Sequence, residues 1–169
     1  PIDADFEFTG TALTLLNPHA LLGGVVTMLL FLTHGAFYIA LKTTGDIRVR
    51  ARALGIRTGL AAAGLALLFL GWTQAETGNG NSLVAFVAAA LLLLASLGAA
   101  ARVREGWAFT GTFVAIALTV TGLFLALFPD VMPSTTDAAH SLTTTNAAST
   151  PYTLEVMSWI ALAVTPMVI

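Results

Sequence analysis

The fold is decided by three consecutive stretches: LVAFVAAALLLLASLGAAA at residues 83–101, RVREG at 102–106 and WAFTGTFVAIALTVTGLFLALF at 107–128. Two long apolar runs flank a short basic turn. A helix needs about 20 apolar residues to cross the ~30 Å hydrocarbon core of a membrane. Neither run alternates polar and apolar residues, as strands of a membrane barrel do. The stretches therefore predict two membrane-spanning helices joined by a turn.

Similar apolar runs occupy residues 18–41 and 58–73, and a fifth begins at residue 153. The chain is 57% hydrophobic and only 9% charged, whereas a soluble domain needs about 25% charged residues to cover its surface. We predict an all-α integral membrane protein, a helical bundle with four complete transmembrane helices and a truncated fifth. The expected divisions are an N-terminal stretch at 1–17, the four-helix bundle at 18–128, a loop at 129–152 and the start of a further helix at 153–169.

The ends of the chain suggest a longer protein. The sequence opens at Pro1 without a Met, and its first residues are acidic rather than basic, unlike a signal peptide. The final apolar run, residues 154–169, would be about 24 Å long as a helix. A terminal carboxylate would then lie in hydrocarbon, which is costly. We therefore expect further residues at both ends.

All basic residues fall in two connections between apolar runs. They are Lys42, Arg48, Arg50, Arg52 and Arg57 in the 42–57 loop, and Arg102 and Arg104 in the 102–106 loop. The alternate connections contain no Lys or Arg. The positive-inside rule therefore predicts that the 42–57 and 102–106 loops are cytoplasmic and that residues 1–17 lie outside. No basic face for nucleic acid is left over.

Small residues predict how the helices pack. In lipid, helices associate through small side chains that allow close backbone approach. In the run at 107–128 such residues recur every three or four positions, which places them on one helix face. This predicted packing face consists of Gly111, Ala115, Thr119, Gly122 and Ala126.

Candidate chemical groups are few. The chain has no Cys, so disulfides and Cys-ligated metals are excluded. No Asp, Glu, Lys or Arg lies inside the four complete spans. Glu155 lies two residues into the expected fifth helix; it is interpreted as a first-turn acid that favours the helix dipole, with a proton or quinone contact as the alternative. His34 lies within the first span, where a packed, hydrogen-bonded side chain is favoured over a haem ligand or proton carrier. His140, in the outer loop, is expected to be solvated.

Several motifs carry a resemblance to a known family. NPHALLGGVV at 17–26, HGA at 34–36 and LKT at 41–43 precede the basic stretch, and FPDVMPST at 128–135, NAAS at 146–149 and TLEVMSW at 153–159 follow it. In order and spacing these motifs resemble the C-terminal half of subunit II of the cytochrome bd quinol oxidases.

The resemblance implies the last five of nine helices and a place in respiration, where a quinol is oxidised, dioxygen is reduced to water and a proton-motive force is generated. In that family haems b and d belong to the partner, subunit I, while subunit II stabilises the complex and in some members holds a structural quinone. The position of His34 is not a family haem ligand. No catalytic, cofactor-binding or metal-binding residue is carried over to this chain.

Three hypotheses follow. The first is a non-haem assembly subunit of a quinol oxidase in a bacterial or archaeal cell membrane, with subunit I and membrane lipids as partners and a quinol as the substrate of the complex. The second is half of a secondary transporter, although such proteins usually have broken helices and polar residues at the membrane midplane. The third is a lipid-binding scaffold without an oxidase partner.

Overall fold

The computed structural model describes residues 10–134 and 137–168. They fall into two compact units, one formed by Gly10–Leu127 and one that includes Phe128–Ile169. The helical elements are a 3-10 turn η1 (Ala12–Leu15), α1 (Pro18–Lys42), α2 (Gly45–Thr77), α3 (Gly80–Ala101), α4 (Glu105–Leu127), a 3-10 turn η2 (Ala138–His140) and α5 (Pro151–Val168). Two short strands, β1 (Asp130–Met132) and β2 (Leu142–Thr143), complete the set.

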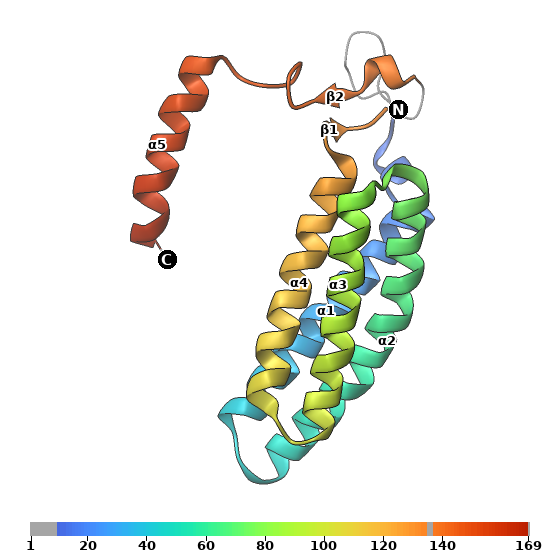
Figure 1. Ribbon diagram of the computed structural model, residues 1–169, viewed down its shortest axis with the longest axis vertical. Coiled ribbons are helices and arrows are strands. Elements are labelled where there is room, and N and C mark those ends of the chain that lie inside the picture. Colours follow the sequence, from blue (N-terminus) through green and yellow to red (C-terminus); the bar gives the residue numbers. More distant parts are fainter. Residues whose placement is uncertain (1–9, 135–136, 169) are drawn as a thin grey trace. The chain divides into compact units, whose positions relative to one another are not determined.

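The first unit is a bundle of four helices, α1 to α4 (Figure 1). Each is long and apolar enough to cross a membrane, and they are the four helices in the described residues for which this holds. The closest packing is between α1 and α2 and between α3 and α4, so the bundle consists of two helical hairpins. The predicted all-α integral membrane bundle is confirmed.

Side-chain caps define two of the helix starts. Asn17 accepts a hydrogen bond from the backbone N–H of Ala20 at 2.8 Å, and Pro18 occupies the first helical position, where its missing N–H costs nothing. At α3, Asn79 accepts from the backbone N–H of Ser82, and the Ser82 hydroxyl accepts from the backbone N–H of Asn79. This reciprocal pair is a capping box.

The 42–57 stretch differs from the predicted loop. Two residues, 43 and 44, separate α1 from α2, and α2 then runs without interruption from Gly45, whose φ of +63° suits a glycine. Lys42 is the last residue of α1, and the four arginines of this stretch lie on α2, because Arg, Ala and Leu are strong helix formers. At about 1.5 Å per residue α2 is ~50 Å long, about 20 Å more than the hydrocarbon core requires.

The interior of the bundle uses glycine where helices approach closely. Phe37 of α1 packs over Gly55 of α2, where an added Cβ would lie 2.6 Å from the Phe37 ring. Phe86 of α3 packs over Gly122 of α4, and a Cβ there would also lie 2.6 Å from the ring. Both hairpins therefore depend on a phenylalanine fitted against a bare backbone.

The second unit contains the short strands and α5. Residues 129–152, predicted as a loop, include β1 and β2, which pair antiparallel with Asp130 opposite Thr143. The Asn146 side chain accepts from the Thr143 backbone N–H at 2.6 Å and donates to the carbonyl of Ser141 at 3.0 Å. Helix α5 begins at Pro151, two residues earlier than expected.

Candidate functional site

A buried ion pair joins α4 to the extended start of α2. Glu105 is the first residue of α4 and is 3% exposed. Arg48 donates from Nη2 to Oε2 at 2.7 Å and from Nε to Oε1 at 3.1 Å, and Arg52 donates from Nη1 to Oε1 at 2.8 Å. Arg48 and Arg52 are one helical turn apart, so both point to the same carboxylate. One acidic side chain thus links α2 and α4 at the end of the bundle where the Lys and Arg residues lie, which we call the basic end.

Electrostatics at this ion pair favour the charged state. The three residues lie outside the apolar runs at 58–73 and 107–128. The hydrogen bond from Arg48 is the main cause that lowers the pKa of Glu105 from 4.5 to about 2, and burial acts in the opposite direction without prevailing. The same hydrogen bond raises the pKa of Arg48. Glu105 is therefore an anion at neutral pH and is matched by two cations.

His34 lies on α1 facing α4. Its Nδ1 is 2.8 Å from Thr112 Oγ1, and its ring stacks on Phe109 with centroids 4.4 Å apart. Within residues 10–134 and 137–168 its Nε2 has no hydrogen-bond partner. The ring is thus packed against α4 through Thr112 and Phe109. The choice between a packed side chain and a haem ligand or proton carrier stays a prediction.

The other two predicted positions, Glu155 and His140, belong to the second unit. Glu155 is exposed on α5 and has no hydrogen bond or ion pair among the described residues. Because α5 begins at Pro151, Glu155 is not in its first turn, and the interpretation as a first-turn acid is wrong. His140 is predicted to be solvated, but its Nδ1 is buried and has no hydrogen-bond partner among the described residues.

The small-residue face of α4 packs on α3. A side chain at Gly111 would collide with Ser96, and one at Gly122 would collide with Phe86. Ala115, Gly122 and Ala126 are buried, and Thr119 is half-buried with its hydroxyl donating to the carbonyl of Ala115. The face that the sequence proposes as a packing surface therefore lies where close helix approach is needed.

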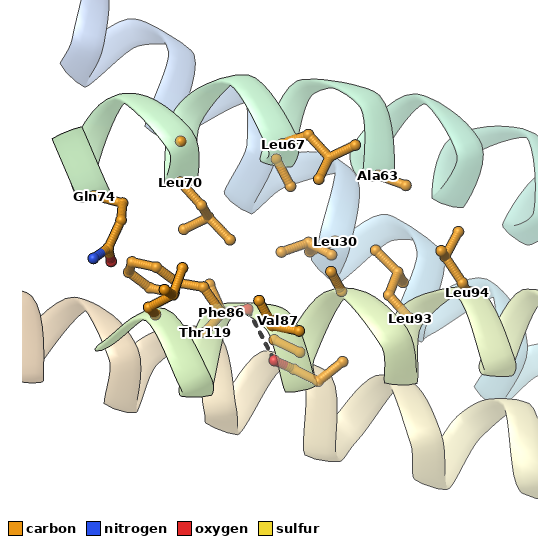
Figure 2. Close-up of a pocket in the computed structure, with 16 residues that line it drawn as sticks. Leu30, Ala63, Leu67, Leu70, Gln74, Phe86, Val87, Leu93, Leu94 and Thr119 are labelled. Atoms are coloured by element: carbon orange, nitrogen blue, oxygen red, sulfur yellow. Dashed lines mark hydrogen bonds between the residues drawn. The ribbon is translucent and has the colours of Figure 1, made fainter. Parts of the chain in front are cut away.

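An apolar groove of about 280 Å³ runs between α2 and α3 (Figure 2). Leu67 and Leu70 of α2 and Phe86 and Leu93 of α3 line it. Gln74 lies at one end, but its amide already donates to the carbonyl of Asn79 and accepts from the Ser82 hydroxyl. The groove can therefore accommodate an aliphatic chain and has little to offer a polar headgroup.

The sequence does not reveal that Glu105 links α2 and α4. It stands between Arg104 and the apolar run, where it resembles an ordinary solvated residue, and its partners are more than 50 residues away. The spacing of Arg48 and Arg52 was the available signal. Among the described residues, no group of three or more His, Asp and Glu side chains is placed to hold a metal ion.

Fold and contacts together define a class, that of multi-pass α-helical membrane subunits whose polar side chains mainly join one helix to another. The chain belongs to the family of cytochrome bd terminal oxidase subunit II, whose family model matches residues 1–169. It is thus part of a multi-pass bacterial membrane protein, as its resemblance to this subunit predicted.

Relatives in three bacteria agree with this assignment. The chain is 37% identical to cytochrome bd ubiquinol oxidase subunit 2 of Bacillus subtilis, covering 100% of this chain and 52% of the relative. It is 29% identical to cytochrome bd-I ubiquinol oxidase subunit 2 of Escherichia coli K12, covering 96% and 52%. It is also 29% identical to a probable cytochrome oxidase subunit 2 of Haemophilus influenzae, covering 89% and 48%. The chain therefore spans about half the length of these curated relatives.

Proposed function

We propose that this chain is part of subunit II of a respiratory quinol oxidase, a complex that oxidises a quinol, reduces dioxygen to water and contributes to the proton-motive force. The match of the family model to residues 1–169 carries the proposal. The relatives named as ubiquinol oxidase subunits in Bacillus subtilis and Escherichia coli support it.

Within such a complex, the role proposed for this chain is assembly and packing against subunit I. Two observations support this role. The four predicted spans contain no Asp, Glu, Lys or Arg, and their ionisable side chains are those of His19, His34 and Tyr38. A proton path through a membrane normally relies on charged residues at that depth. The polar contacts of both histidines join helices: His34 contacts Thr112 of α4, and His19 Nε2 lies 3.0 Å from Thr73 Oγ1 of α2.

The haems b and d of the proposed complex are assigned to subunit I. The haems would supply the electron transfer and oxygen chemistry of the complex. This chain would pack against subunit I and keep water out of the interface between the subunits. A structural quinone in the complete subunit is part of the proposal. The α2–α3 groove does not distinguish a quinone from a lipid, because its apolar walls suit a lipid chain as well as a quinone tail.

The proposed orientation places the basic end of the bundle in the cytoplasm and residues 1–17 outside, in a bacterial or archaeal cell membrane. Its support is the distribution of the seven Lys and Arg residues. The alternative of half a transporter lacks support from the fold, because α1 to α4 are continuous helices, whereas transporter sites typically have broken ones.

Deletion of the complete subunit tests the assembly role. Subunit I is purified from cells with and without subunit II, and haem is measured by reduced-minus-oxidised difference spectra. We expect haem to be lost without subunit II although this subunit ligates none. Full haem in subunit I alone, or a haem spectrum from purified subunit II alone, would contradict the proposal. Substrate flux in proteoliposomes of subunit II alone would favour the transporter.

A further inference from the structure

A second groove, of about 340 Å³, lies between α3 and α4 at the basic end of the bundle. Ala95, Ser96 and Ala99 line it from α3, and Trp107, Gly111 and Val114 line it from α4. In each helix these residues recur at steps of one, three or four, so each set forms one face. From its start near the turn the groove reaches about 10 Å along the two helices.

The groove exists because its walls are small. Alanine and glycine leave space beside the helix contact, and at Gly111 any side chain would collide with Ser96. Two hydroxyls line the groove: that of Ser96 donates to the carbonyl of Leu92 at 2.6 Å, and that of Thr110 belongs to an exposed residue. The rest of the lining is mostly apolar, so the groove fits an aliphatic chain better than a ligand that needs several hydrogen bonds.

Two unpaired cations stand at the end of this groove. Arg102 and Arg104 are exposed, and in the described part of the chain neither guanidinium has an ion-pair or hydrogen-bond partner. The backbone N–H of Arg104 donates to the carbonyl of Ala99 at 2.9 Å, which holds the turn directly over a residue that lines the groove. Trp107, 71% exposed, lies one turn further along α4.

We propose that this groove binds an anionic phospholipid of the adjacent membrane leaflet, with its phosphate paired to Arg102 and Arg104 and the upper part of one acyl chain between α3 and α4. Trp107 is placed at headgroup depth, where indole rings are favoured. Charge complementarity selects an anionic headgroup, because a zwitterionic lipid carries an ammonium group that the two arginines would repel.

Other parts of the bundle offer one half of such a site each. The α2–α3 groove has apolar walls, but the turn beside it, at residues 78 and 79, contains no Lys or Arg. Arg50 and Arg57 are exposed cations on α2, a helix that contributes no residue to the α3–α4 groove. Arg48 and Arg52 are matched by Glu105. These differences supply the controls for a test.

The test uses the complete oxidase complex in nanodiscs that contain equal amounts of phosphatidylglycerol and phosphatidylcholine with identical acyl chains. A photoreactive benzophenone amino acid replaces Leu91, which is exposed one turn from Ala95 on α3. After irradiation, mass spectrometry gives the ratio of the two lipid adducts on that peptide. Each arginine near a membrane surface changes the preference for an anionic lipid by roughly fivefold, so we expect the wild type to favour phosphatidylglycerol by about 25-fold at low salt.

Charge and shape are then varied separately. Arg102→Gln with Arg104→Gln should bring the ratio close to one, whereas Arg50→Gln with Arg57→Gln should leave it within about twofold. Ala95→Phe, which fills the groove, should reduce adducts of both lipids. Raising the salt concentration on the wild-type complex should lower the ratio without any substitution, which covers the case of a variant that fails to fold.

Three results would overturn the inference. They are an adduct ratio of one in the wild type, an equal loss with the Arg50 and Arg57 variant, and a cross-link to a protein segment in place of lipid. The last would show that another helix covers the groove. None of these outcomes depends on oxidase activity, so the lipid site and the proposed function fail separately.

Discussion

The two ends of the four-helix bundle are held together by different chemistry. At the basic end, the Glu105 carboxylate lies between Arg48 and Arg52. At the opposite end, called the neutral end because the described residues form no ion pair between helices there, hydrogen bonds join the helices: Asn79 Nδ2 donates to the carbonyl of Leu125 at 2.6 Å, and His19 contacts Thr73. These contacts lie within the α3–α4 and α1–α2 hairpins, whereas the ion pair joins α2 to α4, which are not consecutive.

The basic residues serve two purposes at one end of the bundle: they orient the protein in the membrane, and two of them also hold helices together. An excess of cations on one side orients a membrane protein, and a single buried acid lets two of those cations also bind helices together. The neutral end carries no such charge, so its contacts are individually weaker. We therefore expect substitutions at the basic end to cost more and to depend on pH.

The largest effect is expected for Glu105→Ala. Breaking a buried ion pair from one side leaves its partners uncompensated and typically costs 3–5 kcal/mol. Because the Arg48 side chain is 40% exposed, water can solvate it, and we expect about 3 kcal/mol. The measurement is the thermal midpoint of the complete complex in detergent. Asp46→Ala, at an exposed acid in the first turn of α2, is the matched control and should cost well under 1 kcal/mol. Equal losses from both would remove the distinction between the ends.

Acid should weaken the same contact. The pKa of Glu105 is lowered from 4.5 to about 2, so the folded state favours the carboxylate. Its stabilising contribution is complete above pH 4.5 and is lost as the pH falls towards 2. We expect the difference in thermal midpoint between wild type and Glu105→Gln to narrow between pH 7 and pH 3. Other carboxyl groups titrate in both proteins and cancel in that difference. A gap that stays constant would mean that the charge of Glu105 is not what holds α2 and α4.

At the neutral end, Asn79→Ala should cost about 1–2 kcal/mol, because it removes the cap of α3 and the hydrogen bond to α4. This loss should not change with pH, unlike that at Glu105. Asn81→Ala is the control, since the Asn81 side chain is exposed and the hydrogen bond of Asn81 to the Asn79 side chain uses its backbone N–H. Thermal midpoints across the same pH range measure both variants. A pH-dependent loss at Asn79 would show that the two ends are coupled.

The sequence predicted the bundle because long apolar runs have few alternatives to spanning helices. It predicted the basic end because Lys and Arg clusters are visible without a structure. It did not reveal the partner of Glu105, since the ion pair joins positions more than 50 residues apart and Arg104 stands beside Glu105 in the chain. The polarity of residues 42–57 predicts a loop, whereas the helix propensity of Arg, Ala and Leu extends α2 back to Gly45. Long-range pairing and helix continuity past the membrane are three-dimensional properties.

The smallest effect concerns the turns at the two ends. The turn between α2 and α3 has glycine and asparagine at positions 78 and 79. The turn between α3 and α4 closes with backbone bonds from Val103 to Ala100 and from Arg104 to Ala99, and places Val103 at φ 61°. This is a Schellman motif with a β-branched residue where glycine is usual.

Left-handed backbone costs an L residue about 1–2 kcal/mol, and Val103→Gly removes that cost. The variant also gives the unfolded chain more freedom, which offsets about 0.4–1 kcal/mol. We therefore expect a net gain of roughly 0.5 kcal/mol, seen as a slightly higher thermal midpoint of the complex. Val103→Ala keeps the Cβ and should gain less. If Val103→Ala stabilised the protein as much as Val103→Gly, the strain would come from the bulk of the valine side chain and not from its left-handed backbone. The α2–α3 and α3–α4 turns would then differ in side-chain packing and not in backbone geometry.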